Sequence, residues 1–191
     1  MAKLFMYDLE TTGTSSTQNG IHQISGIIKI DGTVREEFNF HVRPKQGAVI
    51  DPKALEVAGV TEEQIMSYPD MKSVHPRLVT MMKSFVDPYD RLDKFFLVGY
   101  NNRAFDDNFF RNWFFDCGDK FFGSWFWSNS IDVMVLASQY LAERRREMEN
   151  FKQGTVAKAL GIEVKDENLH DALYDIRICD SIYTIVTQST K

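Results

Sequence analysis

The sequence predicts a domain of the α/β or α+β class whose sheet begins with three antiparallel strands. Three strand patterns stand at the start of the chain, and helical patterns with one further strand occupy the rest. The length of 191 residues is that of one domain, and 43% hydrophobic with 26% charged residues is typical of a globular protein. We therefore expect residues 1–191 to form a single domain.

The first expected strand is residues 3–10, KLFMYDLE, which starts apolar on both faces and is therefore typical of the middle of a sheet. Residues 21–30 and 34–42 follow as strands. The Asp-Gly-Thr loop between them is typical of a hairpin. A fourth buried strand is expected at residues 95–100.

Helical patterns begin after the third strand. Asp51 is a capping residue followed by a proline that suits a first helical turn, and Thr61 opens a second short helix. Longer helices are expected within residues 71–86, 106–116, 132–149, 155–160 and 170–187. Pro76 is compatible with the first of these if it lies in the first turn.

Charge and cysteine content restrict the function. The net charge of −5 provides no broad basic surface, so a polyanion would have to be held locally. The two cysteines, Cys117 and Cys179, are too few for a disulfide framework, and the N-terminus lacks the apolar stretch of a signal peptide. No apolar run is long enough to span a membrane. We expect a cytoplasmic protein without a membrane partner; the oligomeric state is not readable from the sequence.

Two carboxylates on the first strand require an explanation. Asp8 and Glu10 share the strand face of Leu4 and Met6 and lie about 7 Å apart along the chain, so they repel unless a cation lies between them. The small residues that follow, TTG at 11–13, form a turn that a ligand could approach closely. The alternative is that the strand ends at Met6 and the pair is solvated.

Three further residues are candidates for the same site. Asp106 enters a helix near its N-terminus, where it could equally serve the electrostatics of the helix start. Asp175 lies on the core-facing side of the last helix, so it requires a cation, a lysine or a metal. His170 can share a site with Asp175 only if it lies in the loop before that helix, with Asp171 as the capping residue. The alternative for His170 is a solvated loop histidine.

Three short motifs follow one another along the chain: residues 8–13 (DLETTG), 102–106 (NRAFD) and 170–175 (HDALYD). Together they resemble the DEDDh 3′–5′ exonucleases, the family of the proofreading epsilon subunit of bacterial DNA polymerase III, ribonuclease T and oligoribonuclease. Segments 57–61 and 131–137 are also similar to that family, so the resemblance covers nearly the whole chain. It implies a ribonuclease H-like fold, with a five-stranded mixed sheet flanked by helices and its first three strands antiparallel.

The resemblance also implies the chemistry of the site. Asp8, Glu10, Asp106 and Asp175 would bind two divalent cations, with His170 as general base. Carboxylates suit Mg²⁺ or Mn²⁺, whereas four histidines and two cysteines offer little for a zinc site. The expected reaction is metal-dependent hydrolysis of phosphodiester bonds from the 3′ end of single-stranded DNA or frayed ends, which releases nucleoside 5′-monophosphates.

The resemblance further implies residues that contact the substrate. Leu9, Thr11 and Thr12 would lie beside the terminal nucleotide, Phe105 could stack on a base, and Asn102 would hold its loop by side-chain hydrogen bonds. A position in the core is an equal alternative for Phe105, and turn residues are the alternative for the threonines.

Other features have weaker implications for binding. Fourteen aromatic residues lie between Phe95 and Trp127, and we expect most of them in the core, with Trp125 and Trp127 as the better candidates for substrate contact. Ala58 and Asn101 stand where many relatives carry histidine, which leaves the metal residues untouched. The arginine run at 144–146 is expected on a solvated helix face.

Two other functions remain open. One is a 3′–5′ exoribonuclease of the ribonuclease T or oligoribonuclease kind, because no residue indicates whether the site accepts or rejects the 2′-hydroxyl of RNA. The other is a non-catalytic nucleic-acid-binding module.

Overall fold

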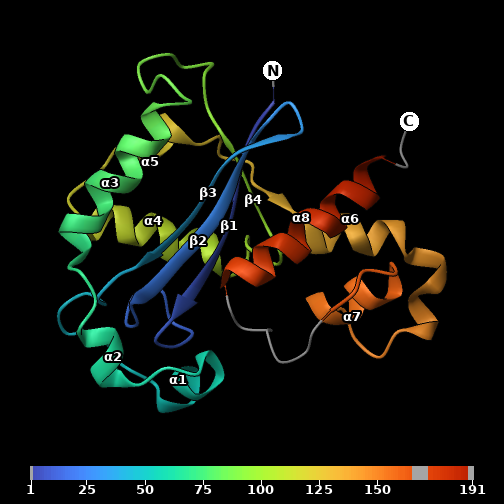
Figure 1. The fold of residues 1–191 in the computed structure, drawn as a ribbon, viewed down its shortest axis with the longest axis horizontal. Coiled ribbons are helices and arrows are strands. Elements are labelled where there is room, and N and C mark those ends of the chain that lie inside the picture. Colours follow the sequence, from blue (N-terminus) through green and yellow to red (C-terminus); the bar gives the residue numbers. More distant parts are fainter. Residues whose placement is uncertain (1, 165–171, 189–191) are drawn as a thin grey trace.

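A computed structural model of the chain describes residues 2–164 and 172–188, in which a five-stranded mixed sheet is covered by helices on both faces (Figure 1). The strands are β1 (Lys3–Thr11), β2 (Ile21–Ile30), β3 (Thr33–His41), β4 (Phe96–Gly99) and β5 (Ile131–Asp132). Their order in the sheet is β3-β2-β1-β4-β5. The pairs β1–β2 and β2–β3 are antiparallel, whereas β1–β4 and β4–β5 are parallel. The predicted central position of the first strand and the three antiparallel strands are confirmed.

The hairpin between β2 and β3 turns on Asp31 and Gly32. Both residues have positive φ angles, 51° and 80°, as a type I′ turn requires. The predicted hairpin is therefore confirmed. The strand pattern missed β5, which has only two residues and thus no alternation to detect.

The helices follow the sequence prediction closely in number and position. They are α1 (Pro52–Ala58), α2 (Glu62–Met66), α3 (Met71–Lys83), α4 (Asp106–Asp116), α5 (Phe122–Trp125), α6 (Val133–Tyr140), α7 (Gln153–Ala159) and α8 (Ala172–Gln188), with a 3₁₀ helix, η1 (Ala142–Glu147). Asp51, Thr61, Asp70 and Asp132 cap α1, α2, α3 and α6 through their side chains. No sequence pattern predicted α5, which is a single turn of four residues. None of the helices within the described ranges has the length and apolar character that a membrane span requires.

One helix prediction was too long. A continuous helix over 132–149 was expected, but α6 ends at Tyr140 and η1 continues as a 3₁₀ helix. The residues of η1 are good helix formers, yet none of them is buried, so no apolar face stabilises an α-helix there. The arginine run at 144–146 is exposed on η1, as expected.

The condition placed on Pro76 was also wrong. Asp70 caps α3, so Pro76 lies in the second turn, where proline removes one backbone hydrogen bond. The helix nevertheless continues to Lys83, because its buried residues Met71, Val74, Leu78 and Met82 pack on the core.

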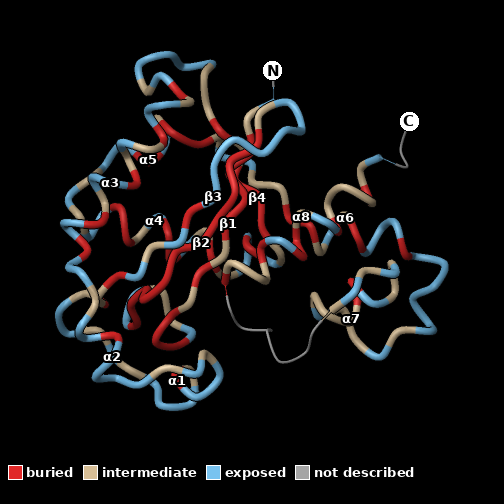
Figure 2. The backbone as a smooth tube through the Cα atoms, viewed as in Figure 1, coloured by how far each residue is buried: buried red, intermediate tan, exposed pale blue. Residues whose placement is uncertain are grey.

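Buried residues lie along the strands in the middle of the molecule (Figure 2), and they form different cores on the two faces of the sheet. The face covered by α3, α4 and α5 holds an aromatic cluster, which includes Phe5, Tyr7, Leu9, Phe110, Phe114 and Phe126. The face covered by α6, α7 and α8 holds an aliphatic cluster, which includes Leu4, Met6, Val98, Val133, Ile176 and Cys179. The strand β1 supplies alternate residues to both, as the pleat of a strand requires.

Candidate active site

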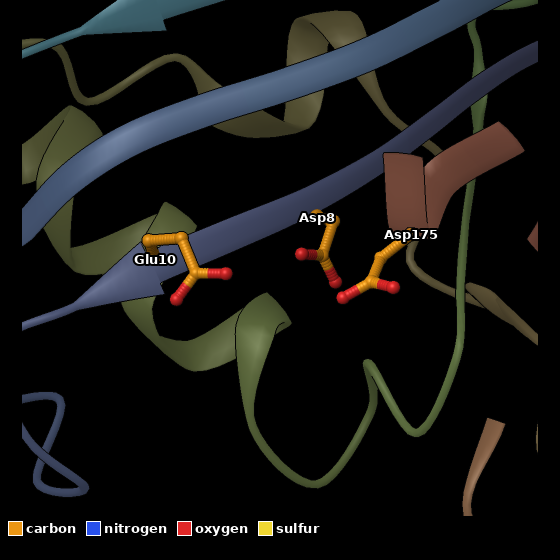
Figure 3. A group of neighbouring side chains, drawn as sticks. All are labelled: Asp8, Glu10 and Asp175. Atoms are coloured by element: carbon orange, nitrogen blue, oxygen red, sulfur yellow. The ribbon is translucent and has the colours of Figure 1, made fainter. Parts of the chain in front are cut away.

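Three carboxylates gather where α8 begins beside β1 (Figure 3). Asp8 and Glu10 extend from β1, and Asp175 extends from the first turn of α8. Each offers an oxygen, and these oxygens all lie within 4.8 Å of one another. All three residues are half-buried, so the cluster is reachable from solvent.

The local sequence explains why these side chains meet. Leu4 and Met6 occupy the aliphatic face of β1, so Asp8 and Glu10 continue the same row. The alternative in which the strand ends at Met6 is wrong, because β1 pairs with β2 through Asp8↔Ser25 and Glu10↔Gln23. Ile176 and Cys179 bury one side of α8 against that face and leave Asp175 facing the strand's acidic end.

The neighbouring thiol does not add a soft ligand. Cys179 is 1% exposed, and burial, followed by the charges of Asp8 and Asp180, raises the pKa of its thiol well above the usual range. The thiol therefore stays protonated at neutral pH, and the site offers carboxylate oxygens to a cation.

Asp106 lies at the start of α4 and contacts the backbone of β1 next to the cluster. Its carboxyl interacts with the backbone of Leu9, the residue between Asp8 and Glu10. Asp106 is 6% exposed, and burial raises its pKa to about 7, with a further contribution from the charge of Asp107. Asp106 is not one of the three residues whose oxygens meet within 4.8 Å. A cation nearby would favour its ionised form.

His170 and Asp171 lie outside the described residues. The predicted roles of these two residues, His170 as general base and Asp171 as capping residue, therefore stay predictions. The helix predicted for residues 170–187 is described from Ala172 onward, as α8.

The turn after β1 is held by its own polar groups. Thr12 is fully buried; its hydroxyl donates to the carbonyl of Val49 at 2.8 Å and accepts the N–H of Gly20 at 2.9 Å. Thr11 donates to the carbonyl of Gly13 at 2.8 Å. A Cβ on Gly13 would lie 2.5 Å from the Asn19 side chain, so only glycine fits this turn. Both hydroxyls thus shape the turn, and a contact with a nucleotide stays a prediction.

The apolar candidates for substrate contact are mostly in the core. Leu9 is 5% exposed and Trp125 is 4% exposed, and both side chains belong to the aromatic cluster. Phe105 is half-buried, with its ring centroid 4.9 Å from that of Phe109 on α4. Trp127 is also half-buried and lies under the Lys94 ammonium, 5.4 Å from the ring centroid. The core interpretation holds for Trp125, and Phe105 and Trp127 keep an accessible side.

Sequence reasoning missed a second carboxylate at the start of α4. Asp107 accepts hydrogen bonds from Tyr7 at 2.6 Å, Asn102 at 3.0 Å and Ser130 at 2.5 Å. Asn102, predicted to hold its loop, does so through this bond and is fully buried. The sequence offered only its position beside Asp106 as a signal.

The comparison with protein families agrees with this geometry. The model of the RNase_T exonuclease family matches residues 5–183. The chain belongs to this exonuclease family. The resemblance to DEDDh exonucleases inferred from the three motifs is thereby confirmed.

Sequence relatives place the match within larger proteins. The chain is 24% identical over 186 residues to the PolC-type DNA polymerase III of Mycoplasmopsis pulmonis. The aligned region covers 97% of this chain and 12% of that protein. The chain is 28% identical over 172 residues to the PolC-type polymerase of Clostridium perfringens, which covers 90% of this chain and 10% of that protein. The chain thus spans about a tenth of the length of these curated relatives.

Solved structures with the same fold include Escherichia coli exonuclease I. Its complex with a dT13 oligonucleotide has a TM-score of 0.77 at 21% identity, covering 98% of this chain and 41% of that one. Its zinc-bound complex with single-stranded DNA has a TM-score of 0.77 at 22% identity, covering 100% and 41%. The predicted ribonuclease H-like fold is therefore confirmed.

Proposed function

We propose that this chain is a metal-dependent 3′–5′ exonuclease. It hydrolyses the terminal phosphodiester bond of single-stranded DNA or of frayed ends and releases nucleoside 5′-monophosphates. The observation that carries this proposal is the cluster of Asp8, Glu10 and Asp175, whose oxygens lie within 4.8 Å in a chain of the exonuclease family. Structures of similar fold that hold oligonucleotides support a nucleic-acid substrate.

The donor set fits two hard divalent cations, Mg²⁺ or Mn²⁺. All clustered ligands are carboxylates, the oxygen donors that these ions prefer. Asp8, Glu10 and Asp175 would hold the cations, and Asp106 would complete the set from the N-terminus of α4. When bound, such a pair activates the attacking water and stabilises the leaving 3′ oxygen.

The chain's own residues then orient the substrate and move the proton. The turn fixed by Thr11 and Thr12 follows directly on the acidic end of β1, where the terminal nucleotide would lie. Phe105 presents its accessible side for stacking on a base. His170 takes the proton of the attacking water, a task suited to a group whose ordinary pKa is near 6.5.

The test is a time course on labelled oligonucleotides with the purified protein. A 5′-labelled single strand with Mn²⁺ or Mg²⁺ should shorten one nucleotide at a time from its 3′ end and release 5′-monophosphates. A chelator and the variant Asp8→Asn should each stop the reaction. Release of 3′-monophosphates, or cleavage that persists in chelator, would contradict the proposal.

Two further arms of this experiment separate the alternatives. A matched RNA strand degraded faster than the DNA would make the protein an exoribonuclease. Binding of both strands without cleavage in either metal would make it a non-catalytic nucleic-acid-binding module.

A further inference from the structure

Asp107 joins three segments that are far apart in the sequence. Its Oδ1 accepts from the Tyr7 hydroxyl on β1 and from Nδ2 of Asn102, and its Oδ2 accepts from the Ser130 hydroxyl ahead of β5. Tyr7 directly precedes Asp8, and Asp107 directly follows Asp106. The bonds therefore connect the strand that holds one pair of site carboxylates to the helix that holds the fourth.

The loop between β4 and α4 is fixed from both sides by this arrangement. The backbone N–H of Asp107 donates to the carbonyl of Asn102 at 2.9 Å, and Nδ2 of Asn102 donates to Oδ1 of Asp107 at 3.0 Å. On the other side, the N–H of Asn101 donates to Asp132 at 3.0 Å. Asn101 adopts a positive φ of 58°, a conformation that asparagine tolerates better than most residues.

The backbones in this region also approach closely. A Cβ on Gly99, the last residue of β4, would lie 2.8 Å from Cβ of Asn102 and 3.1 Å from the carbonyl of Tyr7. The loop thus folds back onto β1, and a small change in its path would move the start of α4 relative to Asp8.

The chemistry of these bonds favours a rigid connection. Tyr7 is 1% exposed, and its neutral hydroxyl donates to the carboxylate of Asp107 away from competing solvent. Hydrogen bonds from neutral hydroxyl groups to a carboxylate are short and strong, and the distances between donor and acceptor oxygens here are 2.6 Å for Tyr7 and 2.5 Å for Ser130.

We infer that Asp107 is a positioning residue of the exonuclease site, which sets Asp106 against the acidic end of β1 through Tyr7, Asn102 and Ser130. This inference rests on the proposed function, because it assigns Asp107 a role toward the cation-binding carboxylates. Groups that orient metal ligands from behind typically contribute 10- to 100-fold to metal affinity or activity.

The experiment compares Asp107→Asn and Tyr7→Phe with a matched control on the same helix, Asp116→Asn. Asp116 is near the far end of α4 and pairs with Lys45 at 3.0 Å, so its variant also removes one charge and one contact. Mn²⁺ binding to each folded variant is measured by electron paramagnetic resonance without substrate. Steady-state kcat and KM on a labelled single strand, and thermal unfolding, are measured alongside.

Asp107→Asn and Tyr7→Phe should weaken Mn²⁺ binding and lower kcat, each by about 10- to 100-fold, with KM changed by less than about threefold. Asp116→Asn should change both quantities by less than about twofold. Asp107→Asn with unchanged Mn²⁺ affinity and kcat would overturn the inference, whatever its effect on stability.

The outcome also separates this inference from the proposed function. A wild-type protein that binds Mn²⁺ but does not cleave would end the proposed function and leave the Mn²⁺ comparison to decide the role of Asp107. A wild-type protein that binds no Mn²⁺ would end both. Loss of folding in Asp107→Asn would leave Tyr7→Phe, which keeps its ring in the core, to decide.

Discussion

The two faces of the sheet differ in the side chains that β1 contributes to them. On the aromatic side, Phe5, Tyr7 and Leu9 are all buried and helices α3 to α5 close over them. On the aliphatic side, Leu4 and Met6 are buried, but the same row continues into the half-buried Asp8 and Glu10. One face therefore serves stability along the whole length of β1, whereas the other combines packing at one end with charge at the other.

The difference shows how a chain with a net charge of −5 can keep mutually repelling carboxylates close together. The aromatic cluster fixes β1 from behind, so the acidic end of the strand does not need to contribute to packing. We expect substitutions on the two faces to separate activity from stability.

The largest effect is expected at the acidic end of β1. Asp8→Ala should lower kcat by about a thousandfold or more, because a cation site supplies several kcal/mol to such a transition state. Without metal, the free energy of unfolding should not fall by more than about 1 kcal/mol, because the lost carboxylate lies beside Glu10 and Asp175. Labelled-strand kinetics and urea unfolding measure the two quantities. Glu36→Ala, an exposed carboxylate of β3, is the control, and an Asp8→Ala rate within tenfold of wild type would refute this expectation.

The opposite result is expected in the aromatic cluster. Phe114 is fully buried, with ring centroids 5.1 Å from both Phe110 and Phe122. Phe114→Ala should cost about 3–5 kcal/mol of unfolding free energy, as large-to-small core substitutions do, while kcat per folded molecule stays near wild type. The neighbouring Phe115 is 65% exposed, so Phe115→Ala should cost about 0.5 kcal/mol or less. The comparison between the faces fails if the two alanine variants are equally stable.

A pH-dependent contribution to the free energy of unfolding is expected where the pairing of β1 with β2 shifts register. His22 lies opposite that shift and is 1% exposed. Burial, with a smaller contribution from the charge of His41, lowers the pKa of His22 from 6.5 to about 4. The unfolded chain then binds more protons between these values, so stability should fall as the pH decreases from 6.5 to 4. The shift corresponds to about 3 kcal/mol.

Urea unfolding of wild type and His22→Leu across pH 7 to 4 tests this term. The variant should lose about 3 kcal/mol less than wild type over that range. His41→Leu, at an exposed histidine, should keep most of the wild-type dependence. Parallel curves for wild type and His22→Leu would show that the buried imidazole is not the source.

The smallest effect is expected where α8 is fastened to the sheet. Lys29 on β2 pairs with Asp180 at 2.5 Å, with side chains only 9% and 20% exposed. Lys29→Met should cost about 1 kcal/mol, and a double-mutant cycle with Asp180→Asn should assign most of it to the pair. The exposed pair Arg177–Glu37 joins α8 to β3 at 2.6 Å, and Arg177→Met should cost about 0.5 kcal/mol or less. A coupling energy near zero for Lys29 and Asp180 would contradict the expectation.

Local patterns predicted the parts of the fold that depend on local physics. Apolar residues on both faces of residues 3–10 predicted a central strand, and the two-residue period of a strand placed Asp8 and Glu10 on one face. The apolar stripe of the last helix predicted that Asp175 would face the core side, where it meets those carboxylates. These features follow from the periods of strands and helices.

Features that depend on distant partners could not be predicted in the same way. The end of α6 at Tyr140 depends on whether any partner buries the residues of η1. The hydrogen bond from Tyr7 to Asp107 spans 100 residues of sequence, and the hydrogen bond from Ser130 to Asp107 spans 23. No local sequence pattern predicts either of them. In the sequence, only its position beside Asp106 marks Asp107, although its carboxylate accepts hydrogen bonds from three segments.

We propose that Asp8, Glu10, Asp106 and Asp175 together hold divalent cations. Anomalous diffraction from crystals grown with Mn²⁺ and a single-stranded oligonucleotide would locate these cations. We expect anomalous peaks among these carboxylates, with the 3′-terminal phosphate beside them and the peaks lost in Asp8→Ala. Peaks found only elsewhere on the protein, or carboxylates that stay in place with no peak among them, would contradict it.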